Sequence, residues 1–135
     1  VHHPEGLLPI NPVGDQAEEE RKAMSDRAEQ RLAELRQMSE EYAKAYSERN
    51  FLEEFKKSKL ALLMKQAELD GHKTAAAQER EARADAEYIA LLQNLRTATE
   101  VSERTRWQLE VSKLGVAVWQ TQNANERAER RAYGA

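Results

Sequence analysis

The side chains in this chain that could do chemistry are chiefly carboxylates. Its 135 residues include 24 Asp and Glu residues, 3 His residues and no Cys. Without Cys there can be no disulfides, thiol catalysis, iron–sulfur clusters or thiolate zinc sites. A two-metal nuclease site needs carboxylates that converge in a water-excluded cavity, whereas these carboxylates recur as on a charged helix face and lack accompanying His residues. The sequence also has no Gly-rich phosphate loop and no Ser/His/Asp set. We therefore expect no enzyme activity, catalytic residue, metal site or cofactor.

Two groups of basic residues could instead contact nucleic-acid phosphates: Lys56, Lys57 and Lys59 in the middle of the chain, and Arg127, Arg130 and Arg131 near its end. Residues 56–73 have five lysines against two acids, a charge of +3, whereas residues 15–54 have twelve acids against seven basic residues, a charge of −5. Lysines that neutralise phosphates release counterions and make binding dependent on salt. The alternative is that both groups are solvated helix faces that form ordinary ion pairs.

The composition predicts the elements that must carry these residues. Hydrophobic residues make up 40% of the chain, charged residues 33% and aromatic residues 6%, and mean hydropathy is −0.87. From Asp15 to Tyr133 there is no proline, and the two glycines are Gly71 and Gly115. These features predict an all-α protein of long helices rather than a β-rich one. No apolar run approaches the roughly 20 residues that span a bilayer, and the first residues lack a signal peptide, so we expect a cytoplasmic protein without membrane contact.

Local capping signals divide the chain. Residues 1–14 contain all three prolines and are expected to form an extended or disordered arm. A single domain, residues 15–135, should follow, with a first helix over about 15–69 that Asp15 and Glu18 cap. The next boundaries are a C-cap at Asp70-Gly71, a short helix over about 75–83 capped by Thr74, and a last helix over about 86–132 capped by Asp85. Two long helices joined at this bend predict an antiparallel, coiled-coil-like helical hairpin.

Apolar residues at helical spacing predict which faces are buried. On the first helix one stripe includes Leu52, Phe55 and Leu62, interrupted by Arg49 and Lys59. The last helix has apolar residues on two faces near its middle, which a single partner helix cannot cover. Another chain, the N-terminal arm or a second hairpin in a four-helix bundle could cover the remaining face. We expect a homo-oligomer, and the predicted interface residues are Trp107, Leu109, Val111, Leu114, Val118 and Trp119.

From Tyr42 onward the chain resembles an uncharacterised family of small all-helical proteins that tailed bacteriophages and prophages encode, often near recombination genes. The resemblance covers roughly two thirds of the chain and includes Arg106-Trp107. It also rests on residues 51–67 (FLEEFKKSKLALLMKQA), 70–79 (DGHKTAAAQE), 87–92 (EYIALL) and 118–131 (VWQTQNANERAERR). In the family a proline commonly follows the aspartate before the Glu-Tyr pair, but here that position is Ala86.

The resemblance implies an accessory protein in the host cytoplasm, and it assigns no catalytic residues to this chain. With the predicted hairpin it favours an oligomeric coiled-coil adaptor for phage or host proteins, possible roles being DNA recombination or early metabolism. One alternative is a nucleic-acid-binding accessory of a phage recombination system, and another is a scaffold component of the virion or tail.

Overall fold

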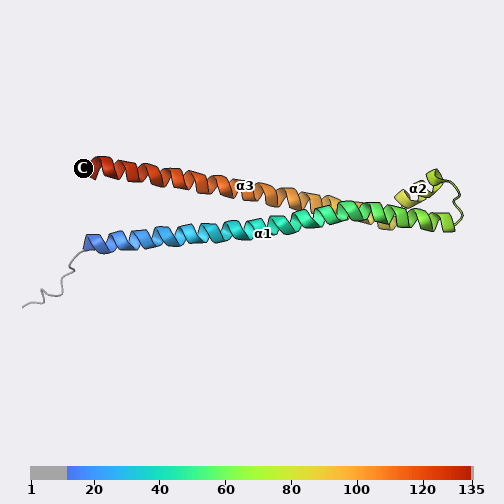
Figure 1. Cartoon of the computed structure of the whole chain (residues 1–135), viewed down its shortest axis with the longest axis horizontal. Coiled ribbons are helices and arrows are strands. Elements are labelled where there is room, and N and C mark those ends of the chain that lie inside the picture. The colour runs from blue at the N-terminus through green and yellow to red at the C-terminus, as the bar shows by residue number, and fades with distance from the viewer. Residues whose placement is uncertain (1–11, 135) are drawn as a thin grey trace, which may run out of the picture. The chain divides into compact units, whose positions relative to one another are not determined.

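The computed structural model describes residues 12–134 and shows an all-α chain (Figure 1). Its helices are α1 (Pro12–Leu69), α2 (Ala75–Ala84) and α3 (Ala86–Gly134), and residues 12–134 contain no strand. The prediction of an all-α fold is thus confirmed. Most of the arm predicted over residues 1–14 lies outside the described residues. No helix within 12–134 has an apolar stretch long enough to cross a membrane.

The chain divides between Arg36 and Gln37 into two compact units. In the first unit the described residues, 12–36, form the beginning of α1. This helix begins at Pro12 rather than at Asp15, because proline fits a first helical turn, where its missing N–H has no intrahelical partner. Asp15 consequently lies inside the first turn, where its charge complements the positive end of the helix, and does not act as the predicted N-cap.

The second unit contains the bend, where α1 ends at the C-cap that the sequence predicted at Asp70-Gly71. The backbone N–H of His72 donates to the carbonyl of Ala67 at 3.0 Å, and that of Gly71 donates to Glu68 at 3.1 Å. Together these hydrogen bonds form a Schellman motif, which requires a positive φ at Gly71, observed at +110°. The break between α1 and α2 is therefore specified by one glycine.

Side-chain caps begin the two helices that follow. The Thr74 hydroxyl oxygen accepts from the Ala77 backbone N–H at 3.1 Å at the start of α2. Asp85 separates α2 from α3, and its carboxylate accepts from the Glu87 N–H at 2.8 Å. Both residues cap the helices that the sequence assigned to them, because the capping geometry depends only on neighbouring residues.

In the second unit, residues 37–69 of α1 contact α3 along what we call the inner seam. Side chains that are buried or half-buried recur there with alternating spacings of three and four residues. On α1 they include Met38, Tyr42, Ala45, Arg49, Leu52, Lys56, Lys59 and Leu63, and on α3 they include Tyr88, Leu91, Leu95, Ala98, Ser102, Thr105, Leu109 and Ser112. The fully buried members on α3 are Tyr88, Leu91, Leu95, Ser102 and Leu109.

Polar contacts across the inner seam show the relative orientation of the two helix segments. Arg49 pairs with Glu103 at 3.2 Å, and Lys59 pairs with Glu87 at 2.7 Å. The Ser112 hydroxyl contacts the Met38 sulfur at 3.0 Å. Partner numbers fall along α3 as they rise along α1, so the two segments run in opposite directions where they touch.

Two residues of the apolar stripe predicted for α1, Phe55 and Leu62, do not lie in the inner seam. Phe55 and Leu62 are 38% and 60% exposed. Arg49, Lys56 and Lys59 take the inward positions instead, because their aliphatic stems cover apolar surface while two of them reach carboxylates on α3. The prediction that Phe55 and Leu62 face inward was therefore wrong.

Candidate interaction surface

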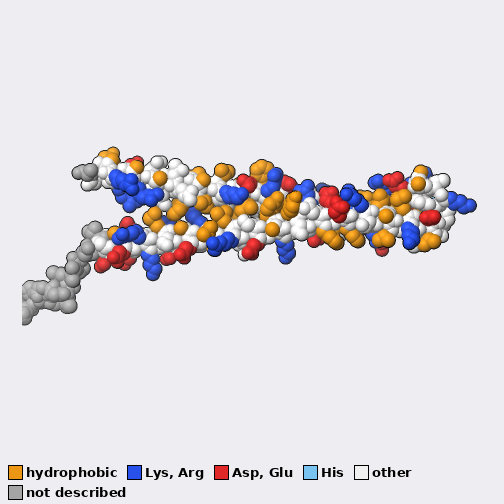
Figure 2. Space-filling model, viewed as in Figure 1, with side chains coloured by type: hydrophobic (Ala, Val, Ile, Leu, Met, Phe, Trp, Pro, Cys, Tyr) orange, Lys and Arg blue, Asp and Glu red, His pale blue; other side chains and the backbone are white. Residues whose placement is uncertain are grey.

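The middle of α3 carries large apolar side chains on the face opposite the inner seam. Trp107, Val111, Leu114 and Val118 are 58%, 65%, 66% and 57% exposed, and we call these four residues the outer stripe. Successive helical residues are rotated by roughly 100°, so spacings of four, three and four residues keep the outer stripe on one face. Figure 2 shows apolar side chains reaching the surface along α3 among charged ones.

The structure separates the six predicted interface residues into two groups. Four of them form the outer stripe. Leu109 is 8% exposed and belongs to the inner seam, whereas Trp119 is half-buried. The two apolar faces read from the sequence are thus real, and in this chain α1 covers one of them.

Trp107 is linked to the inner seam through charged side chains. The Arg106 guanidinium lies 4.9 Å from the Trp107 ring centroid and donates to Glu103 at 3.1 Å. Glu103 also accepts from Arg49 of α1 at 3.2 Å. A cation at this distance is attracted to the face of the indole, and Trp107 nevertheless remains 58% exposed.

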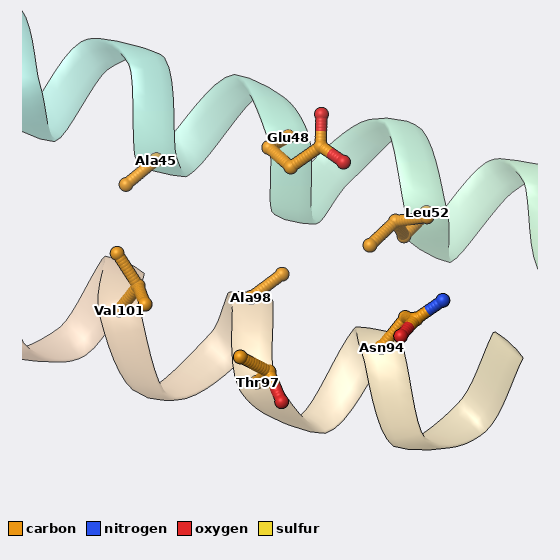
Figure 3. A pocket seen from close by; sticks show the side chains of 7 residues that line it. All are labelled: Ala45, Glu48, Leu52, Asn94, Thr97, Ala98 and Val101. Atoms are coloured by element: carbon orange, nitrogen blue, oxygen red, sulfur yellow. The ribbon is translucent and has the colours of Figure 1, made fainter. Parts of the chain in front are cut away.

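Shallow hollows lie between α1 and α3 beside the inner seam. One, of about 370 Å³, is lined by Ala45, Glu48, Leu52, Asn94, Thr97, Ala98 and Val101 (Figure 3). A neighbour of about 470 Å³ shares Ala45, Glu48 and Val101. Ala45 and Ala98 leave this space because their side chains are too short to meet across it. Such a surface suits insertion of side chains from a partner helix.

A further hollow joins the outer stripe to this side of the molecule. It has a volume of about 510 Å³ and is lined by Met38, Arg104, Trp107, Gln108, Val111 and Ser112. Trp107 and Val111 therefore belong both to the outer stripe and to a depression beside α1. A helix that packs on the outer stripe would also cover the mouth of this depression.

α1 has an exposed apolar face of its own, which the sequence analysis missed. Phe51 and Leu69 are 60% and 75% exposed, and they lie on the same side of α1 as Phe55 and Leu62. The rings of Phe51 and Phe55 are stacked, with centroids 5.7 Å apart and an interplanar angle of 9°. The signal was the recurrence of large apolar residues at spacings of four, seven and seven.

The six basic residues considered for nucleic-acid contact are not brought together. Lys57 pairs with Glu54 at 3.1 Å and Arg130 with Glu126 at 3.8 Å. Lys59 is bound to Glu87 and Lys56 is half-buried, whereas Arg127 and Arg131 are exposed. Arg127 follows Glu87 by forty residues of α3, so the two groups lie about 60 Å apart. The ion pairs favour the alternative of helix faces with ordinary salt bridges.

Within residues 12–134 the titratable side chains form ion pairs rather than a metal-binding cluster. No cluster of His, Asp and Glu among these residues could hold a metal ion. The resolved pKa shift belongs to Arg83, whose pKa is raised because its guanidinium hydrogen-bonds and pairs with Glu79, at 2.8 Å, on the surface of α2. The candidate site is defined by shape and apolar exposure.

Comparison of the whole chain with protein-family models, with curated proteins and with solved structures finds no match to any of them.

Proposed function

We propose that this protein is a non-enzymatic interaction module, an antiparallel coiled-coil hairpin that self-associates through the outer stripe of α3. The observation that carries the proposal is the exposure of four large apolar residues on one face of one helix. Single exposed apolar residues are normal on a protein surface, but a contiguous row of them is typical of an interface.

The energetics favour covering this row. Complete burial of a large apolar side chain contributes roughly 1.5–3 kcal/mol, and each member of the outer stripe retains more than half of its exposure. Each could therefore add about 1–2 kcal/mol when a partner helix covers it. Part of that sum offsets the lost freedom of two associating chains, so we expect self-association that depends on concentration in the micromolar range.

The biological setting of the proposal comes from the resemblance to phage-encoded helical proteins. An oligomeric module of this kind would act as an adaptor that holds phage or host proteins together in the host cytoplasm, in DNA recombination or early phage metabolism. Its support is the residue pattern of 51–67 and 118–131, together with the unpartnered apolar faces that an adaptor requires.

Sedimentation equilibrium of the full chain tests the proposal. We expect the wild type to populate a dimer or higher oligomer, and a Val111→Asp, Val118→Asp double variant to be monomeric with unchanged helical circular dichroism. The matched control is Ala43→Asp, Ser47→Asp, which adds the same charge at exposed positions of α1 and should still associate. A wild type that is fully helical and monomeric at all concentrations would refute the proposal.

A further inference from the structure

The residue spacing of the outer stripe is the same in both directions along α3. Its spacings of four, three and four residues are symmetric about a point between residues 112 and 113. A twofold axis at that point, perpendicular to α3, would place every member of the outer stripe opposite a member from a second copy. Such an arrangement is the isologous contact of a twofold dimer.

We infer that two copies of this chain pair through antiparallel α3 helices, with Trp107 opposite Val118 of the second copy and Val111 opposite Leu114. The inference rests on the proposed self-association and adds its geometry. The apolar contact would be about 17 Å long, on the side of α3 opposite the inner seam.

The polar residues that flank the outer stripe support this direction. In the antiparallel register, the next positions on the same face place Arg104 opposite Thr121 and Glu100 opposite Asn125, so no like charges meet. In a parallel pair each of these residues would face its own copy. Arg104 would then oppose Arg104 and Glu100 would oppose Glu100, and like charges that face each other across an interface are destabilising.

The flanking residues also fix the register. Sliding one helix by a heptad in one direction would bring Leu114 against Arg104 and Val118 against Glu100. Sliding it in the other direction would bring Val111 against Thr121 and Trp107 against Asn125. In either case two of the four apolar residues would face polar side chains, and the first slide would also bury the Arg104–Glu100 ion pair, whose atoms are 2.6 Å apart. The register centred between residues 112 and 113 avoids this mismatch.

Gly115 supplies an independent observation. It lies within α3, where glycine is less favourable than alanine by roughly 1 kcal/mol, yet a Cβ built on it would meet nothing within 4 Å. Packing within this chain therefore does not require a glycine there. In the antiparallel register Gly115 lies at the edge of the contact, opposite Gln108 of the second copy, where a missing side chain lets two helices approach closely.

Single-cysteine crosslinking of the full chain tests the inference, because the chain has no Cys of its own. One preparation carries Arg104→Cys and a second, distinguished by a mass tag, carries Thr121→Cys. Mixed and mildly oxidised, they should form the Arg104→Cys/Thr121→Cys disulfide at least about tenfold faster than either homotypic disulfide. In the antiparallel register, two copies of either position lie about 25 Å apart, too far for a disulfide. Lys113→Cys, which is exposed on α3 away from the outer stripe, is the control and should not crosslink to Thr121→Cys.

The outcomes separate this inference from the proposed function. Fast homotypic crosslinking at Arg104→Cys would show a parallel pair and overturn the inference, although self-association would stand. Association without crosslinking at either position would overturn it in favour of another face, such as that of Phe51 and Leu69. A monomer in sedimentation would refute both. As a second measurement, Gly115→Leu should weaken self-association at least about tenfold and leave the monomer helical, whereas an unchanged dissociation constant would contradict the close approach.

Discussion

Leu109 and Leu114 are close together on α3 and have opposite surroundings. Leu109 is 8% exposed in the inner seam, and Leu114 is 66% exposed on the outer stripe. The same substitution at the two positions should therefore separate folding from association.

We expect Leu109→Ala to lower the free energy of unfolding by about 2–3 kcal/mol, because it removes buried methyl groups and leaves a cavity. Leu114→Ala should change the unfolding of the monomer by less than about 0.5 kcal/mol while it weakens self-association. Urea unfolding at low protein concentration measures the first effect and sedimentation the second. Equal unfolding effects would contradict the assignment of the two faces.

Charged residues of the inner seam are coupled across the two helices. Glu103 accepts from Arg49 and from Arg106, so its loss would leave two guanidinium groups near each other. Because these side chains are partly exposed, with 31% for Arg49 and 43% for Glu103, solvent screens the pair and limits its contribution.

We predict that Glu103→Ala lowers the free energy of unfolding by up to about 1 kcal/mol, whereas Arg49→Leu leaves it unchanged or raises it. The reason for the difference is that an apolar residue at Arg49 extends the seam, while removal of Glu103 isolates cations. Thermal unfolding of the two single variants and the double variant, compared as a double-mutant cycle, checks this. A loss for Arg49→Leu that matches that for Glu103→Ala would show that the ion pair outweighs apolar packing.

At the scale of the elements, the caps could be predicted from sequence and the inner face of α1 could not. Gly71, Thr74 and Asp85 act through hydrogen bonds to residues close in the chain, so their neighbours in sequence are enough to identify them. The inner face of α1 depends on α3, because Arg49 and Lys59 lie there only where Glu103 and Glu87 meet them. An apolar periodicity counts such residues as interruptions and selects Phe55 and Leu62 instead.

The start of α3 offers a prediction on backbone geometry. Asp85 has φ −67° and ψ 135°, an extended conformation that a following proline favours. Ala86 is the first residue of α3, where a backbone N–H has no intrahelical acceptor. Ala86→Pro should therefore be accommodated and stabilise the fold by about 0.4–1 kcal/mol, since it restricts the unfolded chain.

Ala90→Pro is the matched control for this substitution. Ala90 is exposed and lies inside α3, where proline removes a hydrogen bond and costs about 3 kcal/mol. Melting temperatures of both variants measure the difference. A loss of stability for Ala86→Pro would show that the corner between α2 and α3 needs an N–H at that position.

At the scale of the whole molecule, the sequence predicted two apolar faces on the last helix but not how they are used. Their existence follows from spacing alone, whereas the division between an inner seam and an outer stripe follows from which face α1 covers. Leu109 and Trp119 were grouped with Trp107 because all are large and apolar in one segment. Burial, rather than residue type, separates Leu109 and Trp119 from the exposed Trp107.

The position of the buried residues along α3 has a consequence for local opening. Those that are fully buried end at Leu109, and residues 120–134 remain helical while almost wholly exposed. Amide protons exchange through openings whose free energy reflects local burial. Hydrogen–deuterium exchange should therefore be slowest between Tyr88 and Leu109 and grow steadily faster toward Gly134, because the helix opens most readily where its side chains are least buried. Uniform protection along α3 in the monomer would contradict this gradient. Extra protection at residues 107–118 that appears only at high protein concentration would instead report the binding of a second copy to the outer stripe.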